Sequence, residues 1–214
     1  MTRTARRLGI VSAVSVVTLL TLYTLTLVLG FASLESATSP IADPWFSMLE
    51  ILIVLLMPAM VALMVAVHAW APVEAKALSL AALMFMALVA GLTGTLHFII
   101  LTVGHAAVFQ RTPELLSFHW PSVAYALDIL AWDVFFALAM LFAAPVFAGG
   151  RLARAIRLLM IVSGALALAG LSGVMTGDMR LRNIGIVGYD GVFLIVALLL
   201  ALLFYRTDVG RLSC

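Results

Sequence analysis

The sequence predicts an all-α, polytopic transmembrane bundle of six helices. Hydrophobic residues make up 65% of the 214 residues and charged residues only 10%, whereas a soluble domain carries roughly 25% charged residues. The mean hydropathy of +1.22 indicates the same class. A soluble globule of this size needs more polar side chains to cover its surface, so that class is excluded.

Six apolar segments are long enough to cross a bilayer, because a transmembrane helix needs about 20 predominantly apolar residues. They lie at about residues 8–30, 47–67, 77–103, 122–147, 155–175 and 184–205. These segments occupy about two thirds of the chain and leave only short loops between them. We therefore expect residues 1–214 to form a single integral membrane domain.

Local signals support each segment in turn. The apolar run at 8–30 is longer than the 7–15 residues of a signal-peptide core, so we expect it to be retained as a span. Pro44 and Pro121 stand just before the second and fourth segments, where helices are expected to begin. Lys76 precedes the third segment, and the basic run 151–157 leads into the fifth. The sixth segment opens with closely spaced glycines, which favour helix packing.

The basic residues predict the orientation. If the N-terminus is cytoplasmic, nine of the twelve Lys and Arg residues lie on the cytoplasmic side, and Arg111, Arg180 and Arg182 lie outside. Cytoplasmic loops of membrane proteins carry an excess of Lys and Arg. We therefore expect an inner (plasma) membrane protein with both termini in the cytoplasm.

Small residues predict how the fifth segment packs. Ala165, Ala169, Gly173 and Gly177 follow one another at steps of four. Such residues allow close backbone approach between membrane helices. Ala167 falls outside this series, so we expect it to matter less to packing than Gly173.

Ionisable residues inside the spans are the candidate functional residues, because each is costly to place in a bilayer. With a rise of 1.5 Å per residue, Asp133 lies about 16 Å deep, near the midplane of a core about 30 Å thick. Glu50, His97, Asp128 and Asp190 fall in the outer half, on four different helices. The five residues are predicted to converge on one outer-half cavity.

The charges of this set predict unusual chemistry. No Lys or Arg lies in the middle of a predicted span, and Asp133 has no cation in its own or neighbouring turns. We expect Arg180 or Arg182 to pair at the outer surface with Asp178 or Asp190. The carboxylates must then be protonated, share protons or bind a cation. Asp128 and Asp133 are five residues apart, or 140° around an α-helix, and are not expected to share one face.

Aromatic residues near these acids predict a substrate-binding lining. The candidates are Trp132, Tyr125, Tyr189, Phe136 and Phe98. A protonated carboxylic acid in an aromatic pocket is a general acid, and aromatic faces stabilise cationic intermediates.

Three functions fit this pattern. The first is a membrane-embedded enzyme that cyclises or isomerises a lipid or isoprenoid by carboxylate acid/base catalysis. In it Asp133 is the leading proton donor, with Glu50, Asp128 or Asp190 as its partner and His97 as base. The second is a proton- or cation-coupled transporter of small molecules. The third is a non-catalytic lipid-binding protein or membrane subunit.

No cofactor or metal is expected. His97, Asp128 and Asp190 offer metal-ligating atoms, but the sequence lacks the HxxH, ExxH or HxxxH spacing that would support a site. The only lysine, Lys76, lies in a loop and cannot attach retinal. The net charge of +2 is too small for a nucleic-acid binder. The only cysteine is Cys214, so no internal disulfide forms. The expected partners are membrane lipid and a lipophilic small molecule, and the oligomeric state stays open.

Overall fold

The computed structural model describes residues 1–34, 36, 41–104 and 106–207, apart from the side chains of residues 110 and 113. Within these residues, six helical segments are long and apolar enough to cross a membrane, and no strand occurs. The predicted all-α, multi-pass membrane class is therefore confirmed. Cys214 lies outside the described residues.

The six spans match the predicted segments. The first three are α1 (Arg3–Ala32), α2 (Trp45–Trp70), and α3 (Lys76–Val103) with the preceding 3-10 turn η1 (Val73–Ala75). Two short helices follow, α4 (Ala107–Gln110) and α5 (Pro113–Leu116). Span four comprises α6 (Val123–Ile129), the π-helical segment η2 (Leu130–Phe136), α7 (Ala137–Ala143) and the 3-10 turn η3 (Ala144–Val146). Span five comprises α8 (Arg151–Gly170) and α9 (Ser172–Thr176). Span six comprises the 3-10 turn η4 (Met179–Arg182), α10 (Asn183–Ile186), the π-helical segment η5 (Val187–Val192) and α11 (Phe193–Arg206).

Side-chain caps and a glycine fix several helix ends. The Thr2 hydroxyl accepts a hydrogen bond from the Ala5 amide at 3.2 Å, and the Ser122 hydroxyl accepts one from the Tyr125 amide at 3.1 Å. These bonds satisfy amides that have no partner within the first helical turn. Gly177 ends α9 with a φ of 76°, a left-handed conformation that glycine adopts without steric cost.

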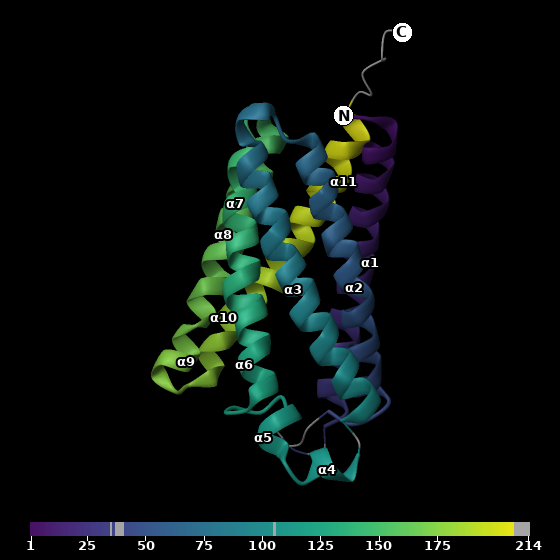
Figure 1. Cartoon of the computed structure of the whole chain (residues 1–214), viewed down its shortest axis with the longest axis vertical. Coiled ribbons are helices and arrows are strands. Elements are labelled where there is room, and N and C mark those ends of the chain that lie inside the picture. Colours follow the sequence, from purple (N-terminus) through teal and green to yellow (C-terminus); the bar gives the residue numbers. More distant parts are fainter. Residues whose placement is uncertain (35, 37–40, 105, 208–214) are drawn as a thin grey trace.

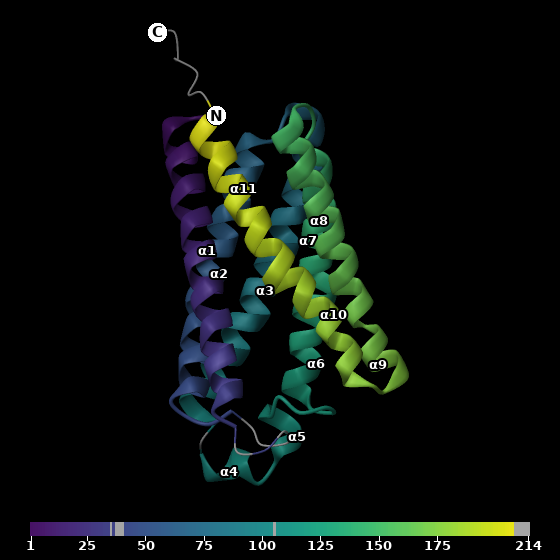
Figure 2. The same ribbon diagram turned by 180° about the vertical axis from the view of Figure 1, so that it is seen from behind.

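The spans form two groups joined by a diagonal helix. Helices α1, α2 and α3 lie side by side, while α7 and α8 pack together next to α3 (Figure 1). Span six runs diagonally behind them, from α10 and η5 against α8 to α11 against α1 (Figure 2). The short helices α4 and α5 lie at the end of the bundle opposite the start of α1. We call this opposite end the distal end.

The first and last helices meet at the other end of the bundle (Figure 1). The Arg6 guanidinium donates hydrogen bonds to the carbonyls of Phe204 and Tyr205, at 2.9 and 2.5 Å. Gly9 packs directly on the Phe204 ring. The beginning of α1 and the end of α11 therefore lie together, as an even number of spans requires.

The orientation in the membrane is still a prediction, and a fusion can test it. We expect a reporter fused after Cys214 to behave as cytoplasmic, because the basic residues are concentrated at the end of the bundle that holds both termini. Paired alkaline phosphatase and green fluorescent protein fusions give the measurement. Phosphatase activity from the C-terminal fusion would contradict the orientation.

The small-residue face of α8 differs from the prediction. Ala165 and Ala169 are exposed, whereas Gly164, Ala167 and Gly170 are buried. An α-helix has 3.6 residues per turn, so a series at strict steps of four drifts by about 40° per step and leaves the contact face. The buried face instead follows alternating steps of three and four, through Ala153, Ile156, Met160, Ser163, Ala167 and Gly170. Ala167 lies on the buried face, and Gly173 in α9 is buried as well, so the expected difference between these two positions stays a prediction.

The interior of the bundle is apolar and unusually rich in methionine. Among the fully buried side chains are Met60, Met64, Met86, Met140 and Met160. Methionine is flexible and fills irregular gaps between helices that are not straight. Many large apolar side chains are exposed along the spans instead, as on α1 and α3, where they contact lipid.

Candidate functional site

Five charged or titratable side chains meet inside the distal half of the bundle. Glu50 comes from the first turns of α2, His97 from the last turns of α3, Asp128 from α6, Asp133 from η2 and Arg182 from the end of η4. All five are buried. We call these five residues the distal network. Four of them were predicted to converge, and Arg182 was not.

His97 lies between two carboxylates from different helices. Its Nδ1 is 2.9 Å from Oε2 of Glu50, and its Nε2 is 3.8 Å from Oδ1 of Asp128. The ring stacks on Phe118, with ring centroids 5.1 Å apart. A neutral imidazole has one N–H, whereas an imidazolium presents N–H groups to both sides. Only Nδ1 is within hydrogen-bond distance of an acceptor, and Nε2 has no hydrogen-bond partner among the described residues. Gaining or losing a proton at His97 therefore changes its contact with Asp128 more than its bond to Glu50.

Arg182 extends the chain of charges to the second buried acid. Its Nη2 donates to Oδ2 of Asp128 at 2.6 Å, and its Nε donates to Oδ2 of Asp133 at 3.2 Å. The guanidinium carbon also lies 4.6 Å from the centroid of the Tyr125 ring. Charge-assisted bonds of this kind are the strongest class of protein hydrogen bond, and the ring face adds a cation–π contact.

The position of Arg182 corrects two sequence-based expectations. It was expected to pair with Asp178 or Asp190 at the outer surface, and Asp133 was expected to have no cation nearby. Asp178 instead accepts from the backbone amide of Arg180, at 3.1 Å. The long arginine side chain reaches into the bundle from η4, so a residue outside the apolar run supplies the buried cation.

The π-helical segment explains how Asp128 and Asp133 share one partner. The prediction that they face apart assumed α-helical geometry. Span four changes to a π-helix over Leu130–Phe136. In a π-helix, hydrogen bonds join residues five apart, so such residues lie one turn apart. Asp133 lies in this segment and Asp128 in α6 just before it, so the wider turns between them bring both carboxylates to Arg182.

Two glycines make room for the Asp133 carboxylate. A Cβ atom added at Gly170 would lie 2.2 Å from Oδ1 of Asp133, and one added at Gly185 would lie 2.4 Å from it. Helices α8 and α10 thus approach this oxygen with their backbones. Within the described chain, Oδ1 has no conventional hydrogen-bond partner. Gly185, one of the glycines at the start of span six that were predicted to serve helix packing, therefore also shapes the site, and Gly170 of span five does so without having been predicted.

Asp190 lies apart from the distal network. Its carboxylate oxygens accept from the Thr24 hydroxyl, at 2.9 and 3.2 Å. It belongs to η5, the second π-helical segment, whose Gly188 carbonyl accepts from the Ser163 hydroxyl at 2.8 Å. π-helical turns occur frequently at functional sites. The predicted convergence thus holds for Glu50, His97, Asp128 and Asp133. Asp190 instead lies at a separate contact between span six and α1.

Tyr23 on α1 is a residue that sequence reasoning missed. Its ring is partly buried and packs against the core of the bundle, and the next residue, Thr24, bonds to Asp190. A tyrosine in an apolar helix looks like an ordinary core residue, and only its neighbours in three dimensions single it out. Helix α1 thus supplies this phenol and the Thr24 hydroxyl to the interior.

The predicted aromatic lining divides into two kinds. Trp132, Tyr189 and Phe136 form one ring cluster, with centroid distances of 5.1, 5.7 and 6.1 Å. Phe98 is 57% exposed and faces away from the interior. It follows His97 directly, and adjacent residues lie 100° apart around an α-helix, so both cannot face the network.

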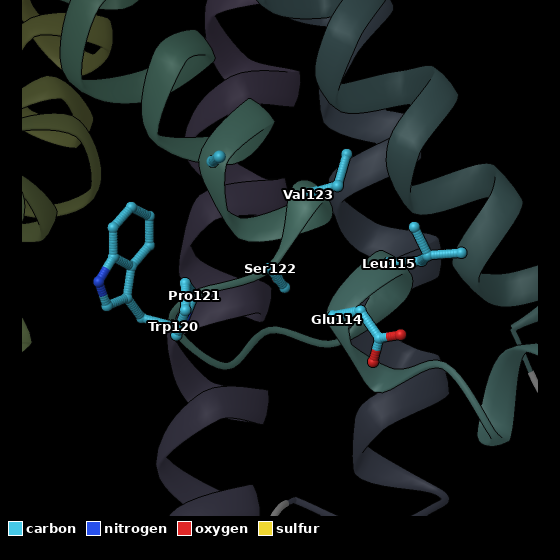
Figure 3. A pocket seen from close by; sticks show the side chains of 7 residues that line it. Glu114, Leu115, Trp120, Pro121, Ser122 and Val123 are labelled. Carbon is cyan, nitrogen blue, oxygen red and sulfur yellow. The ribbon is translucent and has the colours of Figure 1, made fainter.

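Two pockets stand out among the described residues, and neither includes a member of the distal network. One, about 400 Å³, lies between α5 and the start of α6 (Figure 3). The other, about 190 Å³, is an apolar groove between α1 and α2. The carboxylates of Glu50, Asp128 and Asp133 line neither pocket. The Arg182 guanidinium, the His97 ring and the neighbouring aromatic rings pack around them instead.

No group of three or more His, Cys, Asp or Glu side chains in the described ranges is arranged to hold a metal ion. The network nevertheless carries more acid than base. It has three carboxylates against one guanidinium and one imidazole. The network can therefore take up a proton or a cation, and its net charge depends on whether one is bound.

Comparison with known proteins found no match. No protein-family model matches the chain, and neither the curated proteins nor the solved structures contain a match.

Proposed function

We propose that this multi-pass membrane protein is a proton-coupled carrier of a small molecule, and that the distal network is where it binds the coupling proton. One observation carries the proposal: His97 lies buried between carboxylates of two other helices, Glu50 at 2.9 Å and Asp128 at 3.8 Å. Ionisable residues buried within a membrane protein mark substrate or ion pathways and proton relays, among other functional sites.

The network also connects helices that must move if access alternates. Glu50 and His97 belong to the first group of helices, whereas Asp128, Asp133 and Arg182 belong to spans four and six. A proton gained or lost at His97 changes the attraction between these two groups. A ligand that favours one protonation state then shifts the balance between two arrangements of the bundle.

The enzyme hypothesis has lost its main premise. It required Asp133 to be an acid without a local cation, in contact with a lipid substrate. One oxygen of Asp133 instead accepts from Arg182, and the other lies against the backbones at Gly170 and Gly185. A substrate cannot share that position with the helix backbones.

The proposal extends to the location of the protein. We place it in the inner (plasma) membrane with cytoplasmic termini, so the network lies in the outer half. The distribution of Lys and Arg supports this orientation. Protons would then enter from the outside under the usual proton gradient.

Proton coupling can be tested without knowing the substrate. We expect proteoliposomes under an imposed pH gradient to release protons when one charge class of small organic solutes is added, as reported by an internal pH dye. His97→Asn should abolish this flux, because asparagine cannot carry a proton between the two carboxylates. His119→Asn is the matched control, since His119 is exposed.

Two results would contradict the proposal, the first in the role of the distal network and the second in the carrier function itself. Solute-dependent flux that persists in the His97→Asn protein would remove His97 from the coupling. Wild-type vesicles that respond to no class of solute would favour a non-transporting lipid-binding protein or subunit.

A further inference from the structure

The larger pocket lies at the distal end of the bundle, one aromatic ring away from the network. It is an open hollow at the surface with a volume of about 400 Å³. Trp120 on its wall contacts Tyr125 with ring centroids 6.3 Å apart, and the face of Tyr125 carries the Arg182 guanidinium at 4.6 Å. The pocket and the network are thus joined by contacts between neighbouring side chains.

The lining of the pocket combines one charge with one large aromatic ring. Glu114 and Trp120 lie on opposite sides, with Pro121 and Ser122 between them (Figure 3). The lining residues are Glu114, Leu115, Trp120, Pro121, Ser122, Val123 and Ala126. The one charged lining residue is acidic, and an indole is the best aromatic partner for a cation. An amphipathic organic cation matches this lining in charge, size and polarity.

We propose that this pocket binds lipophilic organic cations and that such a cation is the carried molecule, exchanged for protons. This inference rests on the proposed carrier function and names its substrate class. The charge balance of the network gives the reason for exchange. A cation in the pocket and a proton on the network carry like charges on either side of the Trp120–Tyr125 contact, so each weakens binding of the other. Trp120 and Glu114 would hold the cation in the pocket itself.

The binding step can be tested with tetraphenylphosphonium, a lipophilic cation, and tetraphenylborate, an anion of nearly the same shape. We expect equilibrium dialysis against the detergent-purified protein to show saturable binding of the cation alone. Trp120→Leu should weaken it about three- to thirtyfold through loss of the cation–π contact. Glu114→Gln should weaken it about two- to fivefold, as for an exposed ion pair.

Matched control variants remove a carboxylate and an indole that lie outside the pocket. Glu74→Gln deletes an exposed acid at the other end of the bundle, and Trp45→Leu deletes a tryptophan that does not line the pocket. Both variants should bind tetraphenylphosphonium as the wild type does. Equal binding of tetraphenylborate, or unchanged affinity in both Trp120→Leu and Glu114→Gln, would overturn the inference.

The two experiments distinguish a failure of the cation proposal from a failure of the carrier proposal. If another solute class drives His97-dependent proton flux and tetraphenylphosphonium does not bind, the cation inference fails and the carrier proposal stands. If tetraphenylphosphonium binds through Trp120 but no proton moves, the pocket is a cation site and the carrier proposal fails. If tetraphenylphosphonium itself releases protons in vesicles, both are supported.

Discussion

Replacing Arg182 by methionine is expected to lower the free energy of unfolding in detergent by about 3–5 kcal/mol, the usual loss when one partner of a buried ion pair is removed. Arg182 is the guanidinium shared by Asp128 and Asp133, and its side chain is almost fully buried. Methionine keeps much of the apolar stem and removes the charge. The two carboxylates are then left facing each other in an apolar interior. Denaturation followed by circular dichroism measures the loss.

The controls separate the buried charge from a general effect of losing arginine. Arg180→Met removes an exposed arginine two residues earlier and should change stability little. A triple variant with Arg182→Met, Asp128→Asn and Asp133→Asn should recover much of the loss, because replacing all partners of a buried ionic group is often nearly neutral. A loss in Arg182→Met no larger than that in Arg180→Met would contradict the network geometry.

The spans and part of the site could be predicted because they depend on regular helical geometry. The segments follow from hydropathy and length alone. The depth of Glu50 and His97 follows from the rise per residue, and the two side chains do meet, at 2.9 Å. Both helices are α-helical at these positions, so counting residues gives the right face and the right depth.

The rest of the site depends on departures from that geometry. The π-helical turn that aligns Asp128 with Asp133 adds no recognisable residue pattern to the sequence. Arg182 lies before the apolar run of span six, and a hydropathy profile cannot show that its side chain turns inward. The signal that could have found it is the acid excess: buried carboxylates need a cation, and Arg182 is one of the three basic residues placed on that side.

The second large effect is expected at Gly185. We expect Gly185→Ala to destabilise the protein by about 1–3 kcal/mol, the typical cost of overpacking, even though alanine favours helix by about 1 kcal/mol over glycine. The new Cβ would lie 2.4 Å from Oδ1 of Asp133 and 3.3 Å from the Tyr189 ring. Asp133 must then move, and its bond to Arg182 at 3.2 Å must lengthen or break. Thermal unfolding in detergent gives the measurement.

Gly191→Ala is the matched control in the same span. A Cβ at Gly191 would meet no atom within 4 Å, so only the gain in helix propensity remains and stability should hold or rise. Gly170→Ala should resemble Gly185→Ala, because its Cβ would reach the same Asp133 oxygen from α8 at 2.2 Å. Asp133→Ala removes Oδ1 and with it the clash. In an Asp133→Ala background, Gly185→Ala should therefore change the stability of the protein much less. If the destabilisation persists in that background, the cause is helix packing alone, and the two glycines do not serve the carboxylate.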